Sequence, residues 1–452
     1  MSEERQARWR RVLVLAGVAL SLLLLARARA GGDQLNLLAR GWLLAERGEL
    51  VAYGNPLSSG GNGPGALTSV FVGLPLLLWR DARAPIAVIW LFHLAAYALL
   101  DRALRPLGER FRLAFAATYW LAPWRLVYSA FLWNPNYLFL AGAVHFATAR
   151  ASRERARFLA SFAHVLALGL AFQLHPSTLL LAVLSLLLVA RGYSRVHWPG
   201  ALAGGAVAAA TLVPWLRAAA ARPEILAAST GFFGRGLLYV YPLLRGVAYW
   251  FRYGTLYLSE KVARFDFGET LGSGVDRWLA PMANVLWIAA GVASLGVALV
   301  AAWRFARPRW RDALRRLPAS STDRDWVAGY VTLAFASAVA VYAASPTTIM
   351  PWQGLPLLHA AVMPLAFFWD EALAGPRALS ARRGLAALAV ASLVLGIALA
   401  AGSPMFRCAG RGSLVFPLRA SSPMFDDLGL QRSCPWPLDV PGTWWPDVLP
   451  EE

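Results

Sequence analysis

The chain has 452 residues, of which 58% are hydrophobic and only 15% are charged. Soluble globular proteins carry about 25% charged residues, so this composition excludes a soluble enzyme and predicts a protein embedded in a lipid bilayer. The net charge of +18 would suggest nucleic acid in a soluble protein. Here the arginines stand in short clusters between apolar runs, which is the pattern that orients membrane proteins. We therefore expect contacts with membrane lipids and no nucleic-acid partner.

Apolar runs follow one another along most of the chain. The first, 12–26, comes after four arginines, which predicts a cytoplasmic N-terminus. A cleavable signal peptide is the alternative, because Ala28-Arg29-Ala30 has the spacing of a cleavage site, but Arg27 and Arg29 favour an uncleaved helix. Further runs lie at about 67–79, 86–100, 113–124, 126–149, 158–173, 178–190, 201–216, 279–303, 326–343, 354–369 and 384–402. They predict an all-α transmembrane bundle of eleven to thirteen helices.

Arginine clusters between these runs predict the orientation. With alternating runs, 150–157, 191–195, 304–324 and 377–383 fall on the cytoplasmic side of what we expect to be a bacterial inner membrane. One stretch conflicts with this pattern, because 80–83 and 101–112 both have the arginine content of cytoplasmic loops, yet a single run separates them. Either 101–112 is an outer loop, or one run between 86 and 124 does not cross.

Residues 1–402 are expected to form one membrane unit, because no repeat or linker divides them. Three segments fall on the non-cytoplasmic, periplasmic side: the first outer loop 27–66, the later outer loop 217–277 and the tail 403–452. Their Trp, Tyr, Gly, Pro and Arg content favours helices that lie in the membrane interface. The tail holds the two cysteines, Cys408 and Cys434, on the side where disulfides persist. We expect a bridge between them, with two free thiols as the alternative.

The first outer loop begins with an acid in a protein that has few acids. Asp33 precedes 34–50, whose leucine spacing predicts an amphipathic helix that would press Asp33 against the outer mouth of the bundle. Gln34, Asn36, Arg40 and Asn55 in the same loop are candidates for substrate binding. The alternative is that Asp33 only caps the helix, since Asp is a favoured N-cap.

Two polar clusters interrupt later apolar runs and are also candidates for substrate binding. They are Gln173, His175 and Ser177, and Arg125, Asn134 and Asn136. Polar groups at membrane depth are costly and tend to line cavities. Amides beside aromatic rings suit a sugar, and arginine suits a phosphate. A satisfied buried histidine and an aromatic interfacial belt are the alternatives.

One helix followed by Gly32-Asp33-Gln34 resembles the start of the GT-C glycosyltransferases, membrane enzymes that use lipid-phosphate sugars. This superfamily includes protein O-mannosyltransferases and the aminoarabinose transferase of lipid A. The segments Phe131–Asn136 and Gln173–Ser177 resemble segments of its bacterial members. The resemblance implies a GT-C-type bundle with Asp33 as the catalytic base. Gln34 replaces the second acid of the family's pair, and an amide can donate and accept hydrogen bonds but cannot exchange protons.

The resemblance further implies an inverting transfer of a hexose or pentose from a polyprenyl-phosphate carrier to a glycan, lipid or protein acceptor on the outer face. Outer-side arginines would offset the charge of the leaving phosphate; the candidates are Arg40, Arg125, Arg235, Arg245 and Arg252. The sequence shows no metal-ligand spacing and no nucleotide-binding loop, so neither a metal nor another cofactor is expected. An O-antigen polymerase or ligase is one alternative, favoured by the arginine-rich loop 217–277. A non-catalytic lipid or glycan transporter is the other, and helices almost free of charge disfavour it.

Overall fold

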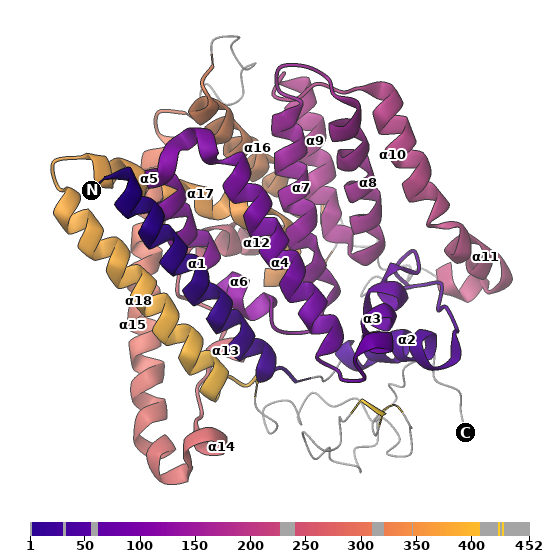
Figure 1. The fold of residues 1–452 in the computed structure, drawn as a ribbon, viewed down its shortest axis with the longest axis horizontal. Helices are drawn as coiled ribbons and strands as arrows, with labels where there is room; N and C mark the ends of the chain where they lie inside the picture. The colour runs from indigo at the N-terminus through magenta and orange to yellow at the C-terminus, as the bar shows by residue number, and fades with distance from the viewer. Residues whose placement is uncertain are drawn as a thin grey trace.

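The computed structural model describes residues 2–29, 33–55, 62–226, 240–309, 321–345, 347–406, 424, 427 and 428. At Asp33, Glu224, Glu260 and Lys261 it describes the backbone but not the side chain. The regular structure of these ranges is helical (Figure 1). Cys408, Cys434 and Arg235 lie outside the described residues, so the bridge between the cysteines stays a prediction.

The helices run between two ends of the molecule (Figure 1). We call them the α5 end, which holds the start of α1 and of α5, and the α2 end, which holds α2 (Asp33–Arg47) and α3 (Leu67–Leu78). Most of the described helices make a full or partial pass between these ends. They are α1 (Glu3–Ala26), α4 (Ala84–Ala103), α5 (Gly108–Phe115) with a π-helical turn (Ala116–Trp120) and α6 (Pro123–Tyr128), α7 (Leu138–Ala151), α8 (Phe158–Leu174), α9 (Leu179–Ala190), α10 (Trp198–Ala210) with α11 (Val213–Ala221), α15 (Ser273–Ala306), α16 (Asp323–Ala343), α17 (Leu358–Ala374) and α18 (Ala378–Gly402).

Only some of these passes have the length and composition of a complete membrane span. Among the described residues these are α1, α4, α15, α16, α18 and the unit Pro351–Ala374, with the bent pair α10–α11 as a seventh. The runs 113–124 and 126–149, which the sequence presents as two helices, are instead divided among α5, the π-helical turn, α6 and α7. A π-helical turn and Pro123 interrupt the regular hydrogen-bond pattern there. The bundle is therefore a membrane fold in which several helices are short or broken.

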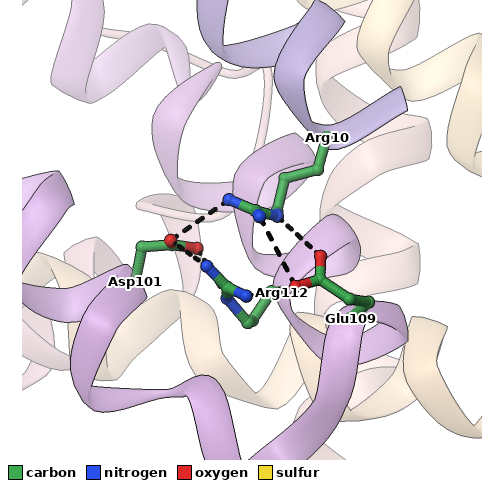
Figure 2. A network of polar contacts seen from close by, with 4 residues as sticks. All are labelled: Arg10, Asp101, Glu109 and Arg112. Carbon is green, nitrogen blue, oxygen red and sulfur yellow. Dashed lines mark hydrogen bonds and ion pairs between the residues drawn. The ribbon is translucent and has the colours of Figure 1, made fainter. Parts of the chain in front are cut away.

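Ion pairs fasten the helices at the α5 end. Arg10 of α1 lies 3.1 Å from Asp101 of α4 and 2.9 Å from Glu109 of α5, and Arg112 contacts the same two carboxylates (Figure 2). Two guanidinium groups and two carboxylates thus join three helices with no net charge.

A second group of ion pairs at this end surrounds Asp370 of α17, which is only 2% exposed. Its carboxylate oxygens form ion pairs with the guanidinium nitrogens of Arg110 of α5, at 2.7 Å, and of Arg324 of α16, at 2.6 Å. Nearby, Asp323 at the start of α16 pairs with two arginines of the α7–α8 region, Arg150 and Arg153. The charges at the α5 end therefore fix how helices distant in sequence pack.

Helix α3 does not cross the bundle, and this resolves the conflict in the predicted topology. A Cβ on Gly41 of α2 would meet Val72 of α3 at 2.3 Å, so the two helices pack in close contact. The next turn stays beside α2, because Arg80 pairs with Glu46 at 3.1 Å and donates to the carbonyl of Ala45 at 3.2 Å. The expectations that 67–79 spans the membrane and that 80–83 is cytoplasmic are wrong, since an apolar run of this length also suits a helix buried against a neighbour.

A continuous series of hydrogen-bonding side chains crosses the interior of the bundle. We call it the interior polar chain, and it consists, in order, of Thr148, His164, Ser185, His145, Tyr330 and His359. The successive donor–acceptor distances are 2.8, 2.8, 2.9, 3.0 and 3.3 Å. Each member has a partner, which is how buried polar groups are tolerated. The chain links α7, α8, α9, α16 and α17.

Candidate functional site

Helix α12 (Val240–Arg252) enters the bundle from the α2 end. Its last turn carries Trp250 and Phe251, which line an apolar cavity together with Phe335 of α16 and Pro364 of α17. The chain then returns along α15, where Trp287 donates to the carbonyl of Leu256 at 3.0 Å. The sequence predicts that all of 217–277 is an outer loop. The structure differs because one face of α12 packs against α15, α16 and α17, while Val240, Tyr241 and Leu244 on its other face stay exposed.

Short helices stand before and after the tip of this segment. η5 (Pro223–Leu226) precedes α12, and α13 (Glu260–Ala263) and α14 (Gly268–Leu271) follow it as the chain returns to the α2 end. Asp266 closes the segment by donating from its backbone nitrogen to the carbonyl of Gly402, the last residue of α18, at 3.0 Å. Residues 240–266 therefore form a re-entrant segment that carries its tip into the helix bundle.

Arg252 stands at the tip of this segment among aromatic rings. Its guanidinium carbon lies 4.6 Å from the ring centre of Tyr257, 5.3 Å from Tyr249 and 5.7 Å from Trp124. It donates to the carbonyl of Leu258 at 3.1 Å, and its Nε has no hydrogen-bond partner among the described residues. Cation–π contacts offset part of the cost of burying the guanidinium but leave its charge in place.

Arg245, two turns earlier on α12, has a similar environment. It donates to the hydroxyls of Tyr241 at 3.1 Å and Tyr249 at 3.3 Å. In the part of the chain that the structure describes, neither Arg245 nor Arg252 is ion-paired with a carboxylate. Two half-buried cations without a counter-ion form an environment that attracts an anion.

A row of aromatic rings leads from these arginines toward the α2 end. The aromatic row consists, in order, of Trp124, Tyr128, Phe131, Trp133 and Trp352, with successive ring-centre distances of 6.2, 5.4, 6.0 and 5.5 Å. Trp124 also contacts the ring of Tyr253 at 5.4 Å, just beyond α12. Trp124, Tyr128 and Phe131 are buried, so the rings that offer a partly exposed face to a sugar or a prenyl chain are Trp133 and Trp352.

Trp352 belongs to the 3₁₀ helix η6 (Pro351–Leu357), which the surrounding residues hold in place. Tyr253 donates to the carbonyl of Pro351 at 2.5 Å, and Gln353 accepts from the backbone of Met350 at 2.6 Å. A Cβ on Gly354 would lie 2.3 Å from the Tyr253 hydroxyl, so only glycine fits there. In the sequence the only signal of this element is the density of prolines from Pro351 onward.

Amide side chains lie at the other end of the aromatic row. Asn134, next to Trp133, donates to Thr68 at the start of α3 at 3.3 Å. Gln173, at the end of α8, donates to Thr211 at the bend between α10 and α11 at 2.7 Å. Its Oε1 faces Gly65, whose φ is +90°, and receives no hydrogen bond within the described ranges. Two of the predicted substrate-binding amides are therefore at one end of the molecule, and one has an unused acceptor.

Helix α2 confirms the predicted helix after the first span, and Asp33 is its first residue. Leu35 of this helix shares a hydrophobic cluster with Leu132 and Leu174, so the start of α2 lies at the same end as Asn134 and Gln173. The side chain of Asp33 is outside the description, so its roles as base or cap stay predictions.

Other predicted residues of the first outer loop are packed into its structure. Gln34 and Asn36 are each 3% exposed. Arg40 is fully buried, donates to the carbonyl of Gly54 at 3.2 Å and lies 5.4 Å from the ring of Tyr53. The backbone carbonyl of Asn55 accepts a hydrogen bond from the backbone nitrogen of Gly63 at 2.9 Å, which closes the end of the loop.

Arg125 and Asn136 hold backbone turns. Arg125 is fully buried, stacks 3.9 Å from the centre of the Trp120 ring, and donates to the carbonyl of Trp120 at 2.8 Å and the hydroxyl of Ser21 at 3.0 Å. Asn136 donates to the carbonyl of Phe131 at 2.8 Å. These bonds explain the residues through the local fold, and their binding roles stay predictions.

His175 and Ser177 are similarly engaged with each other. The ring Nδ1 of His175 lies 2.5 Å from the Ser177 hydroxyl and 3.1 Å from its backbone nitrogen, which caps the short helix η4 (Pro176–Thr178). This is the local role that a polar residue before a proline often has at a helix start. A role in binding stays a prediction for both residues.

No protein-family model matches the sequence, and no curated protein matches it. The structure resembles a crystal structure of ArnT from Cupriavidus metallidurans bound to undecaprenyl phosphate, with a TM-score of 0.52 and 15% identity over 87% of this chain and 76% of that one. The chain has a GT-C fold. The apo state of the same ArnT gives a TM-score of 0.40 with 17% identity over 87% and 78% of the two chains. The likeness to the undecaprenyl-phosphate-bound structure confirms the fold class expected from the sequence.

Within this GT-C fold, the residues that sequence reasoning missed are Trp352, Tyr249 and Tyr253. They come from segments that carry no motif, and only the bundle brings Tyr249 and Tyr253 to Trp124 and brings Trp352 to Trp133. Among the described residues, no three His, Cys, Asp or Glu side chains gather to hold a metal ion. Activity without a metal ion stays a prediction.

Proposed function

We propose that this protein is a glycosyltransferase that moves a sugar from a polyprenyl-phosphate carrier to an acceptor at the α2 end, which would face the periplasm of a bacterium. One observation carries the proposal: Arg245 and Arg252 lie half-buried among aromatic rings, without a carboxylate among the described residues. A lipid phosphate would supply the missing negative charge. The GT-C fold, seen in ArnT with undecaprenyl phosphate bound, supports this choice of ligand.

The donor would extend across three neighbouring surfaces. Its phosphate would contact Arg245 and Arg252, since guanidinium groups bind phosphate oxygens through paired hydrogen bonds. Its prenyl chain would enter the apolar cavity of about 320 Å³ that begins at Trp250 and Phe251. Its sugar would lie against the aromatic row, toward Trp133 and Trp352.

Asp33 would act as the base of the reaction. It takes the proton of the acceptor hydroxyl or amine while the acceptor atom forms a bond to the anomeric carbon of the sugar. The bond between that carbon and the phosphate oxygen breaks, and the phosphate leaves with the electron pair. Arg245 and Arg252 offset the charge that develops on it. One carboxylate is enough for this inverting transfer, so Gln34 in place of a second acid is compatible with it.

The test compares two lipids that differ only in the phosphate. The purified full chain should bind undecaprenyl phosphate at least tenfold more tightly than undecaprenol. Arg252→Gln should remove roughly tenfold of the affinity for the phosphate, because hydrogen bonds to charged groups contribute about 1.5–3 kcal/mol. Arg382→Gln, on an exposed arginine of α18, is the matched control and should change nothing.

The transfer itself is measured with polyprenyl-phosphate hexoses and pentoses and a membrane extract as the source of acceptor. The proposal is supported if the wild type transfers a sugar to an acceptor and the Arg252→Gln variant does not. Equal affinity for the phosphate and the alcohol would contradict it. Lipid-phosphate binding with no transfer to any acceptor would favour a transporter instead.

A further inference from the structure

A second cavity lies far from the aromatic row, near the α5 end. It has a volume of about 240 Å³ and lies among α7, α8, α9 and α10. Val165, Leu168 and Val189 provide apolar walls. Thr148, His164 and Ser185 of the interior polar chain also reach it, but their polar atoms bond to one another. The surface left to an occupant is therefore almost wholly apolar.

The cavity opens on the side of the bundle. Two of its lining residues, Leu186 and Trp198, are 71% and 69% exposed on the outer surface of the helices. In a membrane protein such apolar exposure faces lipid chains, and a tryptophan at a helix start suits the level of the headgroups. An occupant can thus enter laterally from the bilayer.

Arginines stand in the lining of this cavity and next to it in the sequence. Arg195 is an exposed lining residue, and Arg157 is the exposed residue that precedes α8, four positions before the lining residue Ser161. Within the described ranges neither is paired with a carboxylate, whereas Arg150 and Arg153 in the same region are held by Asp323. Glu154 is an acid of this loop, and arginines outnumber it. Among the described residues, this region therefore keeps a positive charge that its neighbours do not neutralise.

We propose that this cavity binds an anionic phospholipid of the leaflet at the α5 end. One acyl chain fills the apolar interior, and the phosphate contacts Arg157 and Arg195. Basic pockets between transmembrane helices on this side of a membrane are suited to anionic headgroups. The site is independent of the proposed sugar transfer, because the arginines of α12 and the aromatic row do not contribute to it.

The headgroup is tested by native mass spectrometry of the full chain, titrated with phosphatidylglycerol and with phosphatidylcholine of the same chains. The wild type should bind phosphatidylglycerol more tightly. Replacing both arginines, Arg157→Gln with Arg195→Gln, should lower that affinity roughly 25-fold, about five-fold for each surface cation. The matched control, Arg382→Gln with Arg383→Gln on exposed arginines of α18 at the same end, should leave it unchanged. Equal affinity for the two lipids, or an equal loss in the control, overturns the proposal.

The acyl chain is tested separately. Ala201 lines the cavity, and Ala201→Phe should lower the affinity for both lipids by occupying their volume. Because this variant can fail to fold, the wild type is also photolabelled with phosphatidylglycerol that carries a diazirine near the end of one chain. Crosslinks in α8, α9 and α10 support the site. Crosslinks spread evenly over the lipid-facing helices, or displacement of the label by undecaprenyl phosphate, overturn it.

Discussion

Two groups of arginines in this protein, one at the α5 end and one on α12, have different surroundings. At the α5 end, Arg10, Arg110 and Arg324 each face a carboxylate at 2.6 to 3.1 Å. On α12, Arg245 and Arg252 face tyrosines, a tryptophan and a carbonyl oxygen. Pairing with a carboxylate satisfies the cation and fixes helix packing. Aromatic rings and neutral acceptors leave the positive charge of the guanidinium uncompensated, so an anionic ligand can bind to it.

The two environments also differ in what a substitution removes. Taking one partner from a buried ion pair leaves an uncompensated charge inside the protein, which costs far more than the pair contributes. Taking an arginine from α12 leaves no carboxylate of the described residues unpaired. Charge changes at the α5 end should therefore affect folding, and those near the aromatic row should affect binding and catalysis.

The largest expected effect is on chemistry at the α2 end. Asp33→Asn should reduce sugar transfer about a thousandfold, since a positioned general base contributes roughly 10²–10⁴-fold. Thermal stability and the affinity for undecaprenyl phosphate should stay at wild-type values. Transfer is measured with a polyprenyl-phosphate sugar under single-turnover conditions. Full activity in this variant would remove Asp33 from the reaction and leave α2 with a structural role.

A somewhat smaller effect, on folding, is expected at the α5 end. Asp370→Asn should lower the free energy of unfolding by about 3 kcal/mol, because two charge-assisted hydrogen bonds to a buried carboxylate are weakened, although Arg110 and Arg324 are exposed enough to be hydrated. Glu371→Gln on the same helix is the control. Glu371 also contacts Arg324, but its side chain is 55% exposed, so the change should be below about 1 kcal/mol. Thermal unfolding in detergent measures both. Equal losses would show that burial does not separate the two pairs.

The smallest expected effect concerns a polar contact without charge. Tyr330→Phe removes the hydroxyl that joins His145 and His359 in the interior polar chain. It should cost about 2 kcal/mol of stability, since buried polar groups are left without a partner. Tyr137→Phe is the control, because the Tyr137 hydroxyl is buried without a partner among the described residues. If Tyr330→Phe is as stable as this control, His145 and His359 find other partners when the Tyr330 hydroxyl is removed.

Much of the architecture could be predicted from composition and charge. The membrane class and the helix after the first span follow from apolar runs and arginine clusters, whereas the side of 101–112 stayed open until the structure placed it. These features depend on patterns local in sequence. Asn134 and Gln173 were also found this way, because each interrupts an apolar run at its end.

The remaining features depend on contacts that a linear pattern does not contain. The run at 67–79 has the apolarity of a span, but only the approach of Gly41 to Val72 shows that α3 lies against α2. The sequence of α12 suits a helix on the membrane surface equally well, and only the contacts with α15, α16 and α17 show that one of its faces packs against the bundle. The members of the interior polar chain were missed because each is a single polar residue in an apolar run, and their partners lie on other helices.

The interior polar chain has a consequence for how the protein is inserted into the membrane. Thr148, His164, Ser185 and His145 come from three consecutive helices and can bond as soon as α9 has entered the bilayer. Tyr330 is 185 residues after His145, so the Nδ1 of His145 lacks its partner in the interior polar chain until α16 is inserted. During insertion, the N-terminal half would therefore lie in the membrane with an unpaired polar group on His145. Pairing with this group would favour the docking of α16, and with it α17, at this position.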